Sequence, residues 1–387
     1  MPEQPILVPT QFDPEDEYRP EPEPEYAPPG WMDGSLRIGI HTSIAGSYLN
    51  ALESASKLGC NALQIFSSSP RMWAGGGVRI TEADGLAFRA RREELGLGPL
   101  VIHANYLINL AAPQPMSRTR SIQAFHDELV RGMMLGADFV VVHPGSRGEM
   151  PPEFAVRNVI DSVKQAAKRL PATRMRILIE NTAGMGAAVG SRLEEVGEIV
   201  LALDRFNVGA CLDTAHLFAA GYDIRSESGL ESTLDLIDRT IGLERVPVFH
   251  VNDSKIPLGG RVDRHEHIGK GKIGAEAFRK LLTNPRLGAS AQYGLPGRAF
   301  LAETPIDEPG EDRQNVAALW ELAGLAETAP AAVKGFSMLT AAAKKSMGKR
   351  IAETKKVARA AEKSKRNAAS ASGTRAAAVA RGKKKKR

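Results

Sequence analysis

Eight short apolar runs, most of them rich in β-branched residues, recur between residues 36 and 303 of this 387-residue chain. Longer segments separate them, and several of these segments carry apolar residues at helical spacing. Strands that alternate with helices predict a parallel sheet, because parallel neighbours need a crossover connection. The expected strands are residues 36–41, 61–67, 100–104, 139–144, 176–181, 208–213, 246–252 and 299–303.

Four of the intervening segments combine the helical pattern with a boundary signal. They are residues 49–58 followed by Gly59, a segment capped by Ser117 and stopped near Gly136, residues 154–170 followed by Pro171, and residues 312–325.

Eight strand–helix units within residues 36–328 match the size of a (β/α)₈ TIM barrel. A doubly wound open sheet is the alternative, but its site normally gathers at one switch point between strands. No Gly-x-Gly-x-x-Gly motif follows the first expected strand, where a nucleotide-binding open sheet carries it, and no Walker-type Gly-Lys-Ser/Thr occurs. We therefore expect an α/β fold of the (β/α)₈ type.

Residue types that bind zinc or manganese stand at the ends of nearly all these strands. In a barrel these ends meet around one mouth, so the side chains are expected to converge there. His41 is interpreted as a hydrogen-bonded packing residue, and Asp253 with Lys255 as a supporting pair. The candidate metal ligands are His103, His143, Glu180, Asp213, His216, His250, Asp263, His265 and Glu303.

The types and spacing of these residues limit the number of bound ions and the reactions that they could support. Glu180 carries a carboxylate that can bridge two cations, and Asp263 and His265 point the same way in extended backbone because they are two residues apart. Nine ligands exceed the three or four that one catalytic zinc uses, so two or three ions are expected. Clustered cations favour phosphoester hydrolysis, while a sugar isomerase or epimerase with one or two metals stays open. A DNA-binding scaffold without activity would leave so polar a rim unexplained.

Both ends of the chain differ from its middle in composition. Residues 1–35 contain nine acids and one arginine and are proline-rich, which predicts a disordered acidic arm. Residues 329–387 form an Ala/Lys/Arg-rich segment, expected to be a flexible basic tail, in which residues 331–387 hold 18 bases and two acids. Such a tail can bind DNA phosphates without sequence preference, and we expect it to hold the protein on duplex DNA, while a role in solubility alone stays open.

Composition also bears on location. Neither a secretory signal nor an apolar run of membrane-spanning length occurs in the sequence. Cys60 and Cys211 lie in or beside apolar runs and are expected to be buried thiols in a reducing compartment. A cytoplasmic protein, nucleoid-associated in a bacterium, with no membrane partner is expected.

Six long motifs contain most of the candidate ligands: YLINLAAP after His103, VVHPGS around His143, IENTAG at Glu180, CLDTAHLFAAGYD at Asp213, HVNDSK at His250 and RVDRHEHIGKGKIG at Asp263. In this order they resemble the endonuclease IV family of apurinic/apyrimidinic (AP) endonucleases, also called deoxyribonuclease IV. The resemblance covers roughly residues 36–328 and leaves both arms outside it.

The resemblance implies a zinc-dependent phosphodiesterase on a TIM barrel, with three Zn²⁺ ions and Mn²⁺ as an alternative at one position. The first ion would be held by His103, His143 and Glu180. Glu180 would bridge to a second, held also by Asp213, His250 and Glu303, and the third would be held by His216, Asp263 and His265. Glu180 and Glu303 would be the catalytic carboxylates.

The resemblance also implies a substrate. The family cuts duplex DNA 5′ to an abasic site, leaving a 3′-hydroxyl and a 5′-deoxyribose phosphate, and removes blocking groups from 3′ ends. It inserts side chains at the lesion, which by position are Arg71, Tyr106 and Leu107 here. Inserted apolar side chains offset the cost of unstacking, and an abasic nucleotide flips out at low cost. We expect a base excision repair enzyme that acts as a monomer on DNA with abasic sites or blocked 3′ ends.

Overall fold

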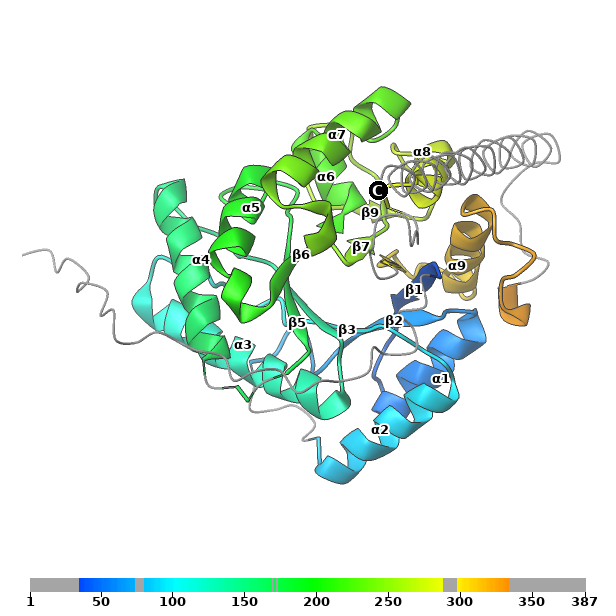
Figure 1. Ribbon diagram of the computed structural model, residues 1–387, viewed down its shortest axis with the longest axis horizontal. Coiled ribbons are helices and arrows are strands. Elements are labelled where there is room, and N and C mark those ends of the chain that lie inside the picture. Colours follow the sequence, from blue (N-terminus) through cyan, green and yellow to red (C-terminus); the bar gives the residue numbers. More distant parts are fainter. Residues whose placement is uncertain (1–34, 74–79, 169, 172, 288–297, 334–387) are drawn as a thin grey trace, which may run out of the picture.

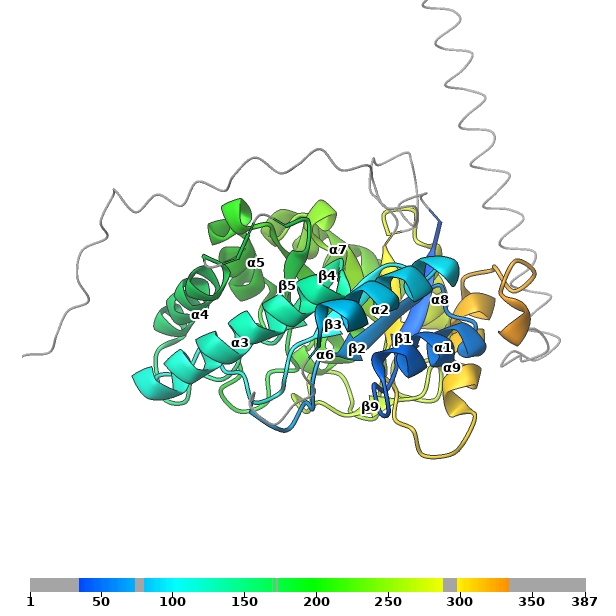
Figure 2. The ribbon, with the colours of Figure 1, turned by 90° about the horizontal axis from the view of Figure 1, so that it is seen from below.

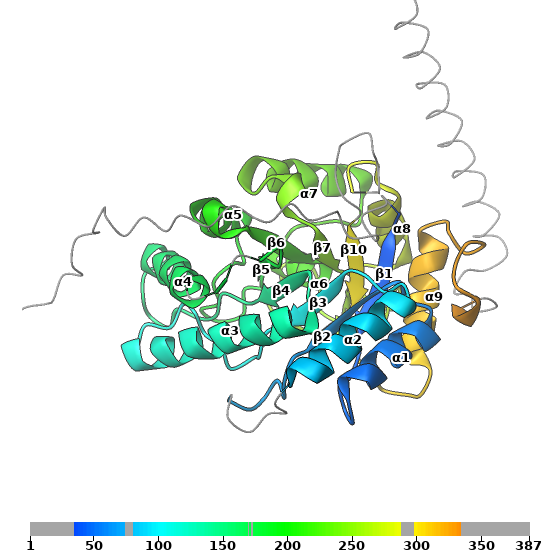
Figure 3. The same cartoon turned by 60° about the horizontal axis from the view of Figure 1, so that its bottom comes forward.

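The structure is a computed structural model that describes residues 35–73, 80–168, 170–171, 173–287 and 298–333. Within these residues the chain forms a closed barrel of parallel strands in the order β1-β10-β7-β6-β5-β4-β3-β2. The strands occupy the middle and the helices surround them (Figures 1 and 3). The expected (β/α)₈ barrel is confirmed, and the open sheet is excluded because β1 pairs with both β2 and β10.

All eight expected strands are present; β6 has the expected bounds, and the other seven are slightly shorter than expected. Two more strands form a small antiparallel hairpin beyond the end of β7. The barrel strands are β1 (Arg37–His41), β2 (Ala62–Phe66), β3 (Leu100–His103), β4 (Phe139–Val142), β5 (Arg176–Glu180), β6 (Val208–Asp213), β7 (Val248–His250) and β10 (Ala299–Ala302), and the hairpin strands are β8 (Asp253–Ser254) and β9 (His265–Glu266).

Helices follow the barrel strands and cover them. They are α1 (Tyr48–Leu58), α2 (Glu82–Glu94), α3 (Pro115–Leu135), α4 (Pro152–Ala167), α5 (Leu193–Ala202), α6 (Thr214–Ala220), α7 (Glu227–Thr240), α8 (Ala275–Thr283) and α9 (Glu311–Leu322), with short 3₁₀ turns at η1 (Asp204–Phe206), η2 (Leu243–Arg245) and η4 (Ala331–Val333).

Two of the expected helix ends are confirmed, whereas α4 ends at Ala167, before the expected stop at Pro171, and one expected helix start is wrong. Gly59 and Gly136 end α1 and α3 in the left-handed conformation, as expected. The expected cap at Ser117 is wrong, because α3 begins at Pro115 with Gln114 as its N-cap. Proline fits the first turn because its missing N–H is not needed there and its φ angle is already helical.

The alternation of side chains along each strand decides which residues reach the barrel interior. One buried apolar cluster lies inside the barrel, and a larger one lies between the strands and the helices. In β5, for example, Leu178 belongs to the inner cluster, whereas Ile177 and Ile179 belong to the outer one. Glu180 has the same parity as Leu178, so its carboxylate points into the barrel mouth.

The same parity holds at the other strand ends. An inner-cluster residue stands two positions before each strand-end ligand, so these side chains enter the mouth from different sides. The pairs are Val101 with His103, Val141 with His143, Cys211 with Asp213, Val248 with His250, and Leu301 with Glu303. The β8–β9 hairpin lies beyond the end of β7, and in Figure 2 β9 lies at the lower edge of the barrel.

Two expectations concern residues at the ends of the chain. The acidic arm at residues 1–35 and the basic tail at residues 329–387 lie almost entirely outside the described residues. Ala329 is buried and η4 contacts α9, so packing against the barrel continues to Val333. Among the described residues, no helix is both long and apolar enough to cross a membrane.

Candidate metal centre

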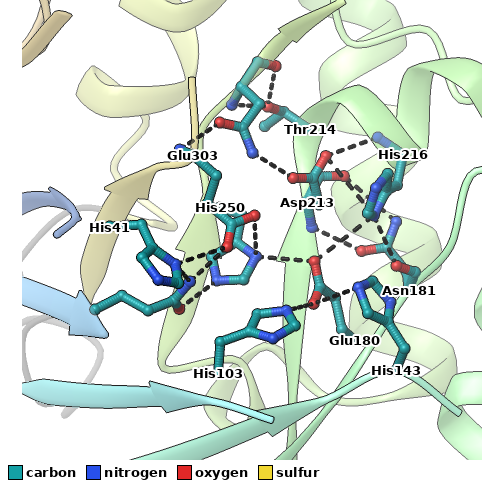
Figure 4. Close-up of polar contacts among 12 residues, drawn as sticks. His41, His103, His143, Glu180, Asn181, Asp213, Thr214, His216, His250 and Glu303 are labelled. Carbon is teal, nitrogen blue, oxygen red and sulfur yellow. Dashed lines mark hydrogen bonds and ion pairs between the residues drawn. The ribbon is translucent and has the colours of Figure 1, made fainter. Parts of the chain in front are cut away.

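Glu180 lies at the middle of the barrel mouth, fully buried at the end of β5 (Figure 4). Its Oε2 lies 3.3 Å from His103 Nε2 and 3.4 Å from His143 Nε2. Its Oε1 lies 2.8 Å from His250 Nδ1 and 3.6 Å from His216 Nδ1. One carboxylate therefore faces two pairs of imidazoles, one pair at each oxygen.

The residues from β6 and β7 lie on the Oε1 side of Glu180. His250 Nδ1 is also 3.3 Å from Glu303 Oε2, which comes from the residue after β10. Asp213 ends β6 and caps α6, where its Oδ1 accepts a hydrogen bond from His216 N at 2.7 Å. This N-cap explains the three-residue spacing of Asp213 and His216, since the cap bonds the third residue of the helix.

The β8–β9 hairpin brings a third set of ligand atoms to the mouth. Asp263 lies 3.1 Å from both His216 Nε2 and His265 Nε2, one through each oxygen. His265 Nε2 is in addition 3.6 Å from Asp213 Oδ2. Asp213 therefore lies near both this third set and the ligand atoms on the Oε1 side of Glu180. Glu180 in turn lies between that side and the pair His103 and His143.

All nine candidate ligands are thus brought together. The ligand atoms form three groups, in each of which they lie within 4.8 Å of one another. The groups are His103, His143 and Glu180; Glu180, Asp213, His250 and Glu303; and Asp213, His216 and His265, with Asp263 beside the last.

Three buried atoms in this centre lack a hydrogen-bond partner: Glu180 Oε2, His216 Nε2 and His265 Nε2. Each nevertheless lies close to an atom of opposite charge, so the atoms point to a common space and not at one another. Zinc bonds of 2.0–2.1 Å in a tetrahedron separate two ligand atoms by roughly 3.3 Å, which is the spacing observed here. The residues therefore fit bound cations.

The histidines are oriented by bonds from their other ring nitrogen. His103 Nδ1 donates to the Ala104 carbonyl at 2.7 Å, and His216 Nδ1 to the Asn181 carbonyl at 3.0 Å. His265 Nδ1 donates to the Glu303 carbonyl at 3.1 Å. A proton held on Nδ1 leaves the Nε2 lone pair free for a cation, which is the usual arrangement of metal-binding histidines.

The charges of the centre depend on each other. Burial alone would raise the pKa of Glu180, but His143 and His250 hold this pKa well below its ordinary value. Burial would lower the pKa of His216, but Asp213 and hydrogen-bonded Asp263 raise it to about 10. The same opposition of burial and these carboxylates raises the pKa of His265 to about 9. Without a cation, protons on the imidazoles compensate the buried carboxylates.

Several polar residues that the strand-end pattern did not single out support the ligands. Asn252 donates to Asp213 Oδ2 at 2.5 Å and accepts from Glu303 N at 2.7 Å. Asn181 accepts from Asp213 N at 2.6 Å. Asn181 directly follows Glu180 in the IENTAG motif and Asn252 stands two positions after His250 in the HVNDSK motif, so their position was the available signal.

Gln64 in β2 was also missed. Its carboxamide is completely buried and contacts His41, His250 and Glu303. His41 packs on Phe66 with ring centroids 4.3 Å apart, so it is a hydrogen-bonded packing residue beside the ligands.

The expected pairing of Asp253 with Lys255 is not found. Asp253 instead accepts hydrogen bonds from Gly271 N, Ile273 N and Ser254 N at 2.8 to 2.9 Å. A Cβ on Gly271 would lie 2.4 Å from Asp253 Oδ1, so this close approach requires glycine. Asp253 thereby fixes the loop that follows the hairpin carrying His265.

A fourth group of acids and histidine lies outside the centre, comprising His267, Asp307 and Glu311. Asn315 Nδ2 donates to His267 Nδ1 at 3.0 Å, and Asn315 Oδ1 accepts from Ile268 N at 3.0 Å, which fixes the amide. His267 Nδ1 is therefore an acceptor, and the proton sits on Nε2, 3.2 Å from Glu311 Oε1. This nitrogen is not free for a metal, so the group is a structural contact at the start of α9.

The three expected DNA-contacting residues lie on two adjacent loops. Arg71 is exposed, Tyr106 is 56% exposed, and Leu107 is half-buried. Tyr106 N donates to the Pro70 carbonyl at 3.2 Å. Asn105 Nδ2 donates to the carbonyls of Ser69 and Met72 at 2.9 and 2.7 Å, which fastens the two loops together.

A cavity of about 560 Å³ opens beside the metal centre. Its walls come from the loops after β3, β4 and β5. They include Tyr106 and Met185, and the ligands His143, His216 and Asp263 also line the cavity. The cavity is therefore in direct contact with candidate metal ligands of the first and third groups.

Comparison with known proteins agrees with this centre. Residues 52–323 match the family described as Xylose isomerase-like TIM barrel. "Probable endonuclease 4" of Solibacter usitatus is 44% identical over 293 residues, which cover 75% of this chain and 97% of that protein. The chain belongs to the endonuclease IV family.

Solved structures of this fold include members of the family and more distant barrels. Endonuclease IV from Thermus thermophilus is 39% identical, with a TM-score of 0.64 over 74% of this chain and 99% of that one. A D-tagatose 3-epimerase-like protein is 19% identical, with a TM-score of 0.55 over 76% of this chain and 99% of that one. At such low identity the second likeness shows a shared fold alone.

Proposed function

We propose that this protein is a metal-dependent AP endonuclease of DNA repair. It hydrolyses the phosphodiester 5′ to an abasic site in duplex DNA, which leaves a 3′-hydroxyl and a 5′-deoxyribose phosphate, and it also clears blocked 3′ ends. The observation that carries the proposal is the set of three adjoining cation positions that share Glu180 and Asp213. Membership of the endonuclease IV family supports the same reaction.

Three Zn²⁺ ions fit the donor set, because each group mixes imidazoles with carboxylates. When bound, the ions would supply Lewis acidity and charge neutralisation to a phosphodiester. Glu180 would hold two of the ions together, and Glu303 would complete the second position. These two carboxylates are the proposed catalytic residues, because Glu180 belongs to two adjoining ligand groups and Glu303 belongs to one of them.

The cavity beside the centre gives the substrate a place. Its size suits a sugar and its phosphates, and its contact with His143, His216 and Asp263 brings such a phosphate to the ligands. An abasic nucleotide has no base to unpair, so it leaves the helix at the lowest cost. Arg71, Tyr106 and Leu107 are the proposed side chains that fill the gap left in the duplex.

A direct assay tests the function. Zinc-loaded protein is incubated with a duplex containing one abasic analogue, and the product ends are identified by extension with a polymerase. We expect incision on the 5′ side that stops when a chelator is added. Incision that survives complete metal removal, or no incision by zinc-loaded protein, would refute the proposal.

Two matched variants locate the activity in the centre. His143→Gln removes a candidate ligand and should lower incision by about a hundredfold, or roughly 2.7 kcal/mol in transition-state free energy. His126→Gln changes a histidine of α3 that bonds the Ala166 carbonyl outside the centre, and it should leave incision near the wild-type level. Equal losses in the two variants would indicate general instability and not a metal role.

A further inference from the structure

Gln64 occupies an inward-facing position in the middle of β2, beside the candidate ligands His250 and Glu303. Its parity matches that of Ala62, which belongs to the inner cluster of the barrel. The side chain is completely buried, and burying an amide is costly unless its polar atoms are bonded. The polar atoms of Gln64 are therefore expected to form hydrogen bonds with the neighbouring side chains.

Every hydrogen-bonding group of this carboxamide has a partner. Nε2 donates to Glu303 Oε1 at 2.5 Å and to His41 Nδ1 at 3.0 Å. Oε1 accepts from His250 Nε2 at 2.8 Å. Rotating the amide by half a turn would set its oxygen against the Glu303 carboxylate, so the neighbouring charge fixes the orientation.

The fixed amide in turn fixes the proton of His250. Because Gln64 Oε1 can only accept, His250 carries a proton on Nε2. Its Nδ1 then faces Glu180 Oε1 and Glu303 Oε2, at 2.8 and 3.3 Å. The other three oriented histidines of the centre present Nε2, so His250 is the one among them that presents Nδ1.

His250 also differs from the other three histidines in the kind of group that orients it. His103, His216 and His265 bond to main-chain carbonyl oxygens, which come with the barrel and its loops. His250 bonds to a side chain on a distant strand. One substitution can therefore remove the orienting bond of His250 and leave those of the other three.

We propose that Gln64 is a positioning residue that presets two ligands of the second cation position, His250 and Glu303. It holds the proton of His250 on the nitrogen away from the cation and turns Glu303 so that Oε2 faces inward. The proposal rests on the metal dependence proposed above, but it concerns cation affinity and not DNA cleavage. Supporting bonds of this kind typically change metal affinity by about 10- to 100-fold.

Zinc titration of metal-free protein against a competing chelator tests the proposal without DNA. Gln64→Met keeps the length of the side chain but neither donates to Glu303 nor accepts from His250 through oxygen. We expect one of the three zinc equivalents to bind at least about tenfold more weakly and the other two to bind as in the wild type. Three equivalents bound with wild-type affinity would overturn the proposal.

Asn61→Leu is the matched control. Asn61 precedes β2 at the opposite end of the barrel, where it accepts from Ile38 N and donates to the Leu36 carbonyl. The Asn61→Leu substitution should lower the thermal unfolding temperature without weakening zinc binding. Weakened zinc binding in both variants would mean that Gln64 acts through general stability, which overturns a positioning role.

A measurement on the unmutated protein keeps the test independent of how the variants fold. The ¹⁵N spectrum of the zinc-loaded protein should show His250 protonated on Nε2 and without a proton on Nδ1. The opposite tautomer would overturn the proposal. Failure of the incision assay would refute the proposed function yet leave this result unaffected.

Discussion

Replacing Glu180 by glutamine should dismantle two cation positions at once. The change keeps the shape of the side chain and removes one buried charge that faces four imidazole nitrogens at 2.8 to 3.6 Å. The new amide group also brings N–H donors towards nitrogens that are themselves donors when protonated. A group so completely buried has no water to relieve this conflict.

The magnitude follows from the number of positions affected. Losing even a supporting hydrogen bond lowers metal affinity by about 10- to 100-fold. Losing the shared ligand should therefore lower the metal affinity of each of the two positions by at least about 100-fold. That corresponds to about 2.7 kcal/mol for each ion. Incision of an abasic duplex, which would need both ions, should then fall by at least about a thousandfold, or roughly 4 kcal/mol in transition-state free energy.

Elemental analysis of the purified variant and single-turnover incision measure the two effects. Glu321→Gln serves as the control, because Glu321 is a buried acid on α9 that belongs to none of the three ligand groups. We expect the control to retain its full zinc content. Glu180→Gln with three zinc equivalents and near-normal incision would refute the bridging role.

Three further predictions test other parts of the molecule. Asn105→Ala should free the loop of Arg71 and weaken binding of abasic duplex by about tenfold, roughly 1.4 kcal/mol, at unchanged zinc content; unchanged anisotropy titrations would contradict this. Truncation after Val333 removes 18 bases and two acids, so the salt dependence of binding to undamaged duplex should become shallower, and an identical slope would dismiss the tail as a DNA contact. In metal-free protein, burial lowers the pKa values of His216 and His265, but the neighbouring carboxylates raise them by more. The net result is a rise from 6.5 to about 10 for His216 and to about 9 for His265. This stabilisation is complete below about pH 6.5 and is lost as pH rises through 9 to 10, so the unfolding temperature in chelator should fall over that range; a flat profile would contradict it.

Much of the centre was predictable because strand parity and strand ends are written in the sequence. Leu178 and Glu180 are two residues apart in a short apolar run, so an inward leucine implies an inward carboxylate at the mouth. The closed barrel then brings the ends of distant strands together. The (β/α)₈ fold and the convergence of the ligands needed no further information.

The supporting polar residues could not be predicted from spacing alone, because their roles depend on contacts between strands that lie far apart in the sequence. Gln64 stands within the run ALQIF, where a lone polar residue is compatible with several packing arrangements. Its role depends on His250 and Glu303, which lie 186 and 239 residues away in the sequence. A lone polar residue at an inward position of an otherwise apolar strand was the one signal that could have identified it.

The segment around β9 shows why residue type and spacing cannot separate a ligand from a structural residue. His265 and His267 are two positions apart, and both lie close to carboxylates. His265 Nδ1 donates a hydrogen bond to the Glu303 carbonyl, which keeps the proton on Nδ1 and leaves Nε2 for a cation. His267 Nδ1 instead meets an N–H of Asn315, which forces the proton onto Nε2. The partner of the far nitrogen, supplied by a distant part of the chain, therefore decides which histidine can bind metal.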